Sequence, residues 1–364
     1  MTARQIDPPE LRYADELAFL AAADEGPRPP GWRLTPRAVV TFVAGSGGAP
    51  VNGRVIEPKF VGERALVERC VVTLAGERGL LLVGEPGTAK SMLSELLAAA
   101  VCGTSALAVQ GTAGTSEDQL RYGWNYALLL AQGPSPESLV PSPILTAMRT
   151  AAVARVEEIT RCLPEVQDAL VSIMSERRIS VPELGTTDFA VPGFCLIATA
   201  NLRDRGVSEM SAALKRRFNF EVVPPIADLD AEVALVTRQA RSAVERGGAT
   251  FGIDEAVLET LVTAFRDLRT GSSAEGWEVE RPSSVMSTAE AVAVAASIGL
   301  STAYLPGPDP LSLLPGHLLG VVRKDDPADA ERLLAYWDGA LRRRAEAGSR
   351  MWRQLWEHRD VLRD

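Results

Sequence analysis

Apolar and polar positions alternate in blocks through the middle of the chain. The segment FVGERALVERCVVTLA, from Phe60, has the apolar spacing of a helix, and GLLLVG follows it as a compact strand that ends in glycine. Strand-like runs then recur, with helical patterns between them, at SALAVQG, AAVARV, FCLIATAN and FNFEVVPP. Because apolar runs that alternate with helices are typical of buried parallel strands, we predict a mainly parallel sheet with helices on both faces.

The pattern differs at the two ends of the chain. Residues 1–55 carry proline and glycine clusters, EGPRPPGW and AGSGGAPVNG, around short helical or strand-like pieces, and we treat them as an N-terminal extension. From about Ile226 the strand-like runs stop, and apolar residues recur every three or four positions, as in VALVTRQARSAV. We therefore predict an α/β core over 56–225 and a helical lid with further helices over 226–364.

One segment inside the core has the pattern of a hairpin. In ERRISVPELGTTDFAVPGF, Ile179 and Val181 alternate with other residues before ELGTT, and Phe189 and Val191 do so after it. Proline cannot donate a hydrogen bond to a neighbouring strand, so the prolines next to the two runs should keep this hairpin short.

Composition sets limits on the function. The 364 residues carry a net charge of −9, which argues against broad binding to a nucleic-acid backbone. No apolar run approaches the ~20 residues that span a bilayer. The N-terminus lacks the basic-then-apolar layout of a signal peptide, so we expect a cytoplasmic protein without membrane insertion. The four cysteines form no C-x-x-C pair and there are two histidines, so neither a disulfide framework nor a zinc site is indicated.

A phosphate-binding pattern follows the strand GLLLVG directly. The segment GEPGTAKSMLSELLAAA fits G-x-x-x-x-G-K-[ST], in which glycines let N–H groups turn toward phosphates, the lysine reaches the terminal phosphates and the hydroxyl holds magnesium. Ala89 stands where the last glycine is usual, and we expect its methyl group to be tolerated at the helix entrance. The predicted nucleotide contacts are Gly84, Glu85, Pro86, Gly87, Thr88, Ala89, Lys90, Ser91 and Met92.

Two adjacent acids end the strand-like run AAVARV. Ligands of parallel sheets bind outside the carboxyl ends of the strands, so Glu157 and Glu158 should face the phosphate-binding loop. Successive side chains at a strand end diverge. We therefore assign Glu157, together with Ser91, to magnesium, and Glu158 to the attacking water. The alternative is that EEITR only begins a helix, with acids placed near its positive end.

These motifs resemble those of the AAA+ ATPases, and within them the MoxR-like and dynein-related branch. GEPGTAKS looks like Walker A, VARVEEI looks like Walker B, and EEITRCLPEVQDALVSIMSERRISVPE is similar to the branch's succession of acid pair, helix and hairpin. The resemblance runs from about Phe60 to Pro225 and implies a P-loop NTPase core of the α/β class, a C-terminal all-helical lid, and ATP with Mg²⁺ as cofactors. Glu157 departs from it, because the branch commonly has aspartate there.

The resemblance also assigns residues on the core. FCLIATAN is similar to the sensor 1 strand, which implies that Asn201 orients water or touches the γ-phosphate. SAALKRRFNF is similar to the helix end that presents an arginine finger to a neighbouring subunit, and Arg217 matches it best, with Arg216 a close rival. In FVGERALVERC, Val61 and Gly62 look like the adenine-side loop.

One assignment falls on the helical part. The segment ERPSSVMSTAEAV resembles the lid helix that carries the sensor 2 arginine, and it offers Arg281 as the candidate. The family's usual arginine follows the proline, where this chain has Ser283.

The function that the resemblance implies is hydrolysis of ATP by a homo-oligomeric ring, usually a hexamer, that remodels, activates or assembles a protein partner. The hairpin would project toward the pore of the ring and contact the substrate. Relatives in this branch often work with a protein that carries a von Willebrand factor A domain. No such domain follows in this sequence, so we expect a separate partner.

Two other functions remain open at this point. An ATP-binding assembly or scaffold protein with little turnover is suggested by the Glu157 substitution. A nucleic-acid motor on the same core is disfavoured by the acidic charge and by the absence of a recognisable helix-turn-helix or basic-aromatic module.

Overall fold

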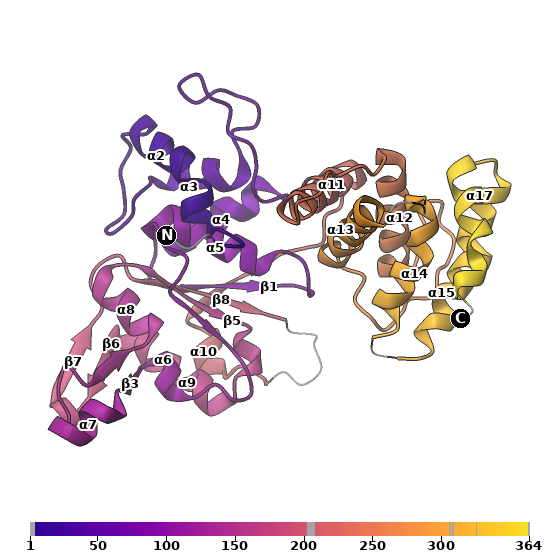
Figure 1. Ribbon diagram of the computed structural model, residues 1–364. Coiled ribbons are helices and arrows are strands. Elements are labelled where there is room, and N and C mark those ends of the chain that lie inside the picture. Colours follow the sequence, from indigo (N-terminus) through magenta and orange to yellow (C-terminus); the bar gives the residue numbers. More distant parts are fainter. Residues whose placement is uncertain (1–3, 202–207, 306, 308, 325, 363–364) are drawn as a thin grey trace. The chain divides into compact units, whose positions relative to one another are not determined.

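The computed structural model describes residues 4–201, 208–305, 307, 309–324 and 326–362. The chain divides into an α/β unit of residues 1–85 and 89–224 and a helical unit of residues 225–364, to which Pro86–Thr88 are also assigned. Figure 1 shows both units. None of the helices within the described ranges is both long and apolar enough to span a membrane.

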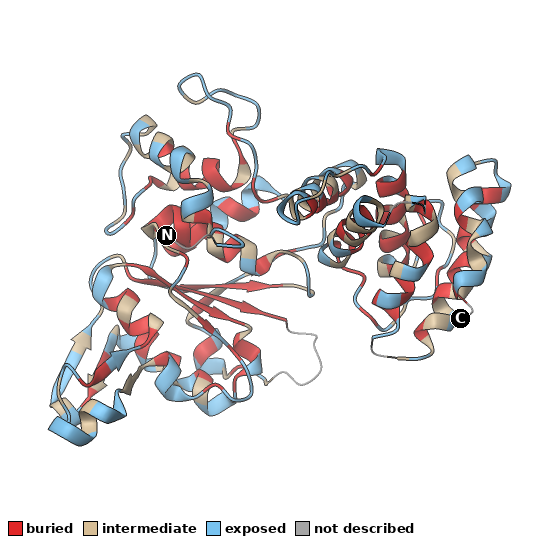
Figure 2. Ribbon diagram, in the orientation of Figure 1, coloured by how far each residue is buried: buried red, intermediate tan, exposed pale blue. Residues whose placement is uncertain are grey.

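A five-stranded parallel sheet forms the centre of the α/β unit, with the strand order β2-β5-β8-β1-β9. Its strands are β1 Gly79–Val83, β2 Ala108–Gln110, β5 Val153–Glu157, β8 Cys195–Ala200 and β9 Phe218–Val222. Four of them lie in the strand-like runs after GLLLVG and the fifth is GLLLVG itself, so the predicted parallel sheet is confirmed. Figure 2 shows the inner strands buried along their length.

Both faces of the sheet are covered, because alternate strand residues enter two different cores. Leu80 and Leu82 pack on one face with helices α4 Arg64–Leu74 and α5 Lys90–Cys102. Leu81 and Val83 pack on the other face. The helices that cover this second face are α6 Glu117–Leu120, α8 Pro143–Thr150, α9 Pro164–Glu176 and α10 Ala212–Lys215 (Figure 1). This double burial explains why the strands read as continuous apolar runs.

The N-terminal segment is part of the α/β unit rather than a separate arm. It forms helices α1 Pro9–Arg12, α2 Ala14–Ala23 and α3 Pro36–Ala44, whose apolar side chains join the core around α4 and α5. Phe42 is fully buried there, with the ring of Tyr13 at a centroid distance of 5.7 Å. The proline and glycine clusters that set this segment apart in the sequence lie in the connections from α2 to α3 and from α3 to α4.

Two small antiparallel sheets extend from the second face. The first consists of β3 Tyr122–Trp124 and β4 Leu139–Pro141, joined through helix α7 Tyr126–Gln132. The second is the predicted hairpin, with β6 Arg178–Val181, the 3-10 turn η2 Pro182–Leu184 and β7 Thr186–Phe189. It has four residue pairs, as short as its prolines predicted. Ile179 and Val181 are buried, but Phe189 and Val191 are exposed.

The helical unit confirms the change of pattern after Ile226. It has its own core, in which Val236, Phe265, Leu314 and Trp337 are fully buried. Its elements are α11 Leu229–Arg246, α12 Glu255–Thr270, α13 Thr288–Tyr304, α14 Pro310–Val322, α15 Asp329–Tyr336, the π-helical segment η3 Trp337–Leu341, α16 Arg342–Glu346, α17 Arg350–Glu357 and η4 Arg359–Leu362.

Candidate functional site

The phosphate-binding pattern occupies the turn between β1 and α5. Gly87 and Ala89 have φ angles of +75° and +65°, so the loop contains two left-handed residues before the helix starts at Lys90. A left-handed alanine costs about 1–2 kcal/mol relative to a right-handed one, because its Cβ approaches the following carbonyl oxygen. The methyl group of Ala89 is therefore accommodated, as expected, but in a conformation that glycine adopts at lower cost.

Lys90 is held against the loop from which it extends. Its ammonium group donates hydrogen bonds to the carbonyl oxygens of Gly84 at 2.9 Å and of Glu85 at 2.8 Å, and the residue is buried. Burial lowers the pKa of Lys90, and the nearby carboxylates of Glu158 and Glu157 oppose that change. The position of the cation beside the loop is the one that the motif requires for contact with phosphates.

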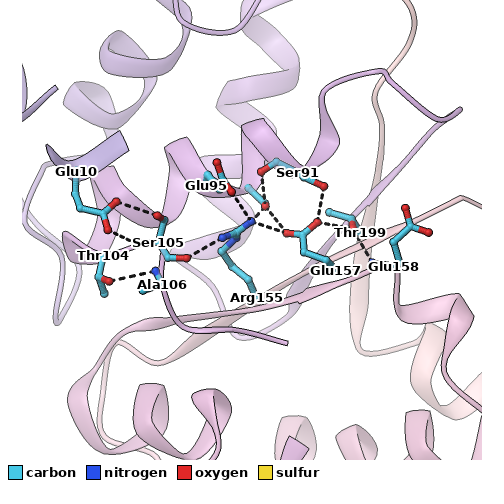
Figure 3. A network of polar contacts seen from close by, with 11 residues as sticks. Glu10, Ser91, Glu95, Thr104, Ser105, Ala106, Arg155, Glu157, Glu158 and Thr199 are labelled. Carbon is cyan, nitrogen blue, oxygen red and sulfur yellow. Dashed lines mark hydrogen bonds and ion pairs between the residues drawn. The ribbon is translucent and has the colours of Figure 1, made fainter. Parts of the chain in front are cut away.

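Glu157 ends β5 and reaches the first turn of α5, where its carboxylate accepts four hydrogen bonds (Figure 3). Its Oε2 accepts from the hydroxyls of Ser91 at 2.7 Å and Thr199 at 2.8 Å. Its Oε1 accepts from Ser94 at 2.7 Å and from the guanidinium of Arg155 at 2.8 Å. The structure thus brings Glu157 directly to Ser91, the other residue assigned to magnesium.

The carboxyl group of Glu157 is ionised despite its burial. Desolvation acts to raise the pKa, but hydrogen bonds from Ser91 and Ser94 and the charge of Arg155 outweigh it, so the net pKa lies below the usual value. Anionic and hydroxyl oxygens are the donors that Mg²⁺ prefers, so the Glu157 and Ser91 pair fits the ion that the motif implies.

Glu158 diverges from Glu157 as predicted, and the backbone explains how. Its φ of +55° is left-handed and turns the chain out of β5 into the 3-10 turn η1 Ile159–Arg161. Its N–H donates to Thr199 Oγ1 at 3.0 Å, and its carboxylate accepts from Arg161 Nε at 2.8 Å. Figure 3 shows the side chain on the far side of Thr199 from Glu157. The short turn η1 shows that EEITR does begin a helical segment. A helix start at this point is therefore compatible with a site at Glu157 and Glu158.

The remaining core residue, Asn201, directly follows β8 and is buried. Because β8 lies between β5 and β1 in the sheet, Asn201, Glu157 and the phosphate-binding loop all lie at the carboxyl ends of three adjacent parallel strands. This edge is where α/β sheets bind their ligands.

The two arginines considered for the finger differ in exposure. Arg217 folds back onto its own chain, donating to Ser175 Oγ and to the carbonyl oxygen of Ala213. Arg216, the C-terminal cap of α10, is exposed. A finger for another subunit needs a guanidinium at the surface, so exposure favours Arg216, whereas the sequence pattern favours Arg217.

The outer positions remain predictions. Val61 is half-buried and Gly62 exposed, just before α4, and a Cβ on Gly62 would lie 2.5 Å from the ring of Phe60. Arg281 is exposed in the helical unit. Ser283, at the position of the family's arginine, donates from both its N–H and its hydroxyl to the buried carboxylate of Asp329.

Sequence reasoning missed three residues of the site: Ser94, Thr199 and Arg155. Ser94 lies one helical turn after Ser91, and Thr199 lies inside an apolar strand, so neither had a distinguishing signal. Arg155 did have one, because a charge inside the apolar run AAVARV two residues before Glu157 must face the same side of the strand.

Comparisons with known proteins give two family matches. Residues 79–218 match the AAA domain (dynein-related subfamily), and residues 230–363 match the YehL-like AAA+ ATPase C-terminal domain. The first match covers four of the five sheet strands, β1, β2, β5 and β8, together with the phosphate-binding loop, and the second covers most of the helical unit.

One of the relatives matches most of the chain. The uncharacterized protein YehL of Escherichia coli (strain K12) is 45% identical over 348 residues, which cover 94% of each chain. An uncharacterized protein of Staphylococcus aureus (strain NCTC 8325 / PS 47) is 28% identical over 54% of this chain and 70% of its own length. Among solved structures, NtrX from Brucella abortus in complex with ADP is 15% identical, with a TM-score of 0.46, over 84% of this chain and 69% of that one.

Proposed function

The chain belongs to the YehL-like AAA+ ATPases, and from that premise we propose that it hydrolyses Mg²⁺-bound ATP in a homo-oligomeric ring that remodels, activates or assembles a protein partner. The observation that carries the proposal is the contact between Glu157 and Ser91, because it joins the Walker B and Walker A positions through one ionised carboxylate. We propose that this reaction takes place in the cytoplasm.

Each residue of the site has a role in this proposal. The loop N–H groups and Lys90 bind the phosphates, and Ser91 with Glu157 would hold Mg²⁺, which supplies positive charge to the phosphate oxygens. Glu158 orients the attacking water and accepts its proton, and Asn201 helps to position that water. The hydrogen bond from Arg161 holds the Glu158 carboxylate away from Glu157.

A ring is proposed because the α/β unit supplies an arginine at its surface. Exposed Arg216 is available to the site of a neighbouring subunit, and Arg217 would have to release Ser175 and Ala213 first. A client protein is proposed to bind at the two small antiparallel sheets and α7: Phe189 is 64% exposed on the β6–β7 hairpin and Leu130 is 88% exposed on α7. Large exposed apolar side chains are typical of protein contact sites when they gather in a patch. A partner with a von Willebrand factor A domain is one candidate.

Phosphate release measured against protein concentration tests the proposal. Wild type should become more active per subunit as it assembles, and Glu158→Gln should lose about 10²–10⁴-fold of that activity. Arg216→Ala should lose activity by a similar or larger factor, since an arginine finger contributes about 10³–10⁵-fold. Lys215→Ala, an exposed neighbour on the same helix end, is the matched control and should stay active.

Mixing the variants shows whether the finger acts between subunits. An Arg216→Ala subunit keeps its own Glu158, and a Glu158→Gln subunit keeps its arginine, so a mixture should recover activity that neither variant has alone. If the mixture stays inactive while Arg217→Ala with Glu158→Gln recovers, Arg217 is the finger. If no mixture recovers and wild-type activity is independent of concentration, the ring proposal is wrong.

A second candidate is an ATP-binding assembly protein with little turnover. The observation that favours it is the Glu157 carboxylate, whose oxygens already accept four hydrogen bonds. Under this alternative, assembled wild type would release phosphate no faster than Glu158→Gln, although both would bind ATP.

A further inference from the structure

Arg155 is a buried cation in the middle of a parallel sheet. It lies on β5, between Ala154 and Val156, and is 4% exposed. Taking a charged side chain out of water costs several kcal/mol unless a partner of opposite charge and further hydrogen bonds compensate for it. A position of this kind in a P-loop sheet therefore requires a specific set of partners.

The partners of Arg155 are all within the α/β unit. Its Nε donates to Ser94 Oγ at 3.0 Å, one terminal nitrogen donates to the carbonyl oxygen of Ser105 at 2.7 Å, and the other donates to Glu157 Oε1 at 2.8 Å. The more exposed carboxylate of Glu95 lies 3.5 Å from the same nitrogen as Glu157. Figure 3 shows the guanidinium between Ser105 and Glu157.

The two carboxylate oxygens of Glu157 have different hydrogen-bond partners. Arg155 and Glu157 are two residues apart, so they share the strand face toward α5, where Ser91 and Ser94 stand one turn apart. Oε1 is held by Arg155 and Ser94, on the side away from the phosphate-binding loop. Oε2 is left for Ser91 and Thr199.

We propose that Arg155 is a positioning residue that allows a glutamate to work at position 157, because it anchors one carboxylate oxygen and thereby presents the other to Ser91. The proposal rests on the proposed function, in which Ser91 and Glu157 hold Mg²⁺. It explains why the longer acid fits: the extra methylene lets the carboxylate reach both the guanidinium and the hydroxyl. On this proposal, the glutamate at position 157 requires the arginine at position 155.

An aspartate at position 157 could not make both contacts. Aspartate retracts the carboxylate by roughly one C–C bond, about 1.5 Å, so it could keep Ser91 or Arg155 but not both at hydrogen-bond distance. Either outcome is unfavourable: the first leaves a buried guanidinium without its main partner, and the second removes the acid from the magnesium side. Glu157→Asp, which restores the residue common in the resembled branch, should therefore harm this protein while Arg155 is present.

The test measures the Mg²⁺ concentration that half-saturates binding of a fluorescent, non-hydrolysable ATP analogue to the full chain. Arg155→Gln and Glu157→Asp should each raise that midpoint about 10-fold or more, as loss of a group that orients a metal ligand usually does. The double variant Arg155→Leu with Glu157→Asp should return to within about 3-fold of wild type, because coupled sites are not additive. Arg155→Lys keeps the positive charge but lacks the planar guanidinium that donates to several partners at once, so it should raise the Mg²⁺ midpoint by an intermediate amount.

The matched control is Arg344→Gln. Arg344 in the helical unit is also a buried arginine, paired with buried Asp267 at 2.6 Å, so its loss should lower the melting temperature without moving the Mg²⁺ midpoint. If Arg344→Gln moves the midpoint as far as Arg155→Gln, the effect is general destabilisation and the positioning role is wrong. It is also wrong if Arg155→Gln binds with the wild-type midpoint, or if the double variant is as weak as its two single changes combined.

All of these readouts are binding measurements. A wild type that binds the analogue with Mg²⁺ but releases no phosphate from ATP would overturn hydrolysis and leave the result on Arg155 standing.

Discussion

Left-handed backbone at single residues shapes the candidate site. Among the described residues, Ala89 and Glu158 are two of five non-glycine residues with positive φ, and both stand where a strand gives way to a helical turn. Such conformations persist only where the surrounding structure imposes them, and they are common at functional sites. At Glu158 the conformation separates the two acids, whereas at Ala89 it sets the entry into α5.

We expect Ala89→Gly to stabilise the α/β unit by about 0.5–1 kcal/mol. The relief of left-handed strain, about 1–2 kcal/mol, is partly offset by the greater freedom of glycine in the unfolded chain. Urea unfolding followed by circular dichroism measures this. Ala151→Gly, at a φ of +53° after α8, is a control away from the loop and should give a similar gain. If Ala89→Gly but not Ala151→Gly lowers the urea midpoint, the methyl group of Ala89 makes contacts that outweigh the strain.

Elements of the helical unit are tied together by one arginine. Arg344 on α16 donates through its fork to Glu275, at 2.8 and 2.7 Å, and also to Asp267 on α12 at 2.6 Å. Glu275 belongs to the segment between α12 and α13, so the arginine fixes that segment to two helices. The hydrogen bonds from Arg344 lower the pKa of Glu275 to about 2.

The pH dependence of stability follows from this pKa. A carboxyl whose pKa falls on folding contributes stability above its ordinary value of 4.5, and that contribution disappears as pH falls toward 2. The full shift corresponds to about 3 kcal/mol, but the Glu275 side chain is 41% exposed, and solvent screening reduces this to about 1 kcal/mol. Glu275→Gln should therefore be less stable than wild type at pH 7, and the two urea midpoints should converge below pH 3. A difference that is constant with pH would contradict the ion pair.

At the scale of the whole molecule, the α/β core depends on the first 55 residues. Leu20, Leu34 and Phe42 are each no more than 2% exposed and share one core with the strands and with α5. The ammonium of Lys59 lies 5.0 Å from the centre of the Phe42 ring, which adds a cation–π contact at the same place. The segment therefore contributes to folding of the unit that carries the phosphate-binding loop.

Phe42→Ala tests this contribution. We expect it to lower the free energy of unfolding of the α/β unit by about 3–5 kcal/mol, the usual cost of removing a fully buried phenyl ring. Leu11→Ala, at a 48% exposed position in the same segment, should change it by no more than about 0.5 kcal/mol. Equal, small effects of both changes would mean that the segment is a loosely attached arm.

The sequence predicts those parts of the molecule whose signal is local. Strands buried on both faces give continuous apolar runs, and the phosphate-binding pattern is contiguous from Gly84 to Ser91, so the sheet and the loop are readable. Phe42 was hidden because proline and glycine connections surround its helix. The role of Arg155 was hidden because its partners come from α5, the loop before β2 and its own strand, and only the folded chain brings them together.

The hydrogen bonds between Glu10 and Ser105 limit where the chain can be truncated for recombinant expression. Glu10 on α1 accepts from the N–H of Ser105 at 3.1 Å and from its hydroxyl at 2.9 Å, and the carbonyl oxygen of Ser105 is the one that holds Arg155. A cloning boundary at residue 56, which the proline and glycine clusters invite, would remove Glu10 together with Phe42. Recombinant protein for nucleotide assays should therefore retain α1 to α3, because trimming them would disturb a chain of contacts that leads to Glu157.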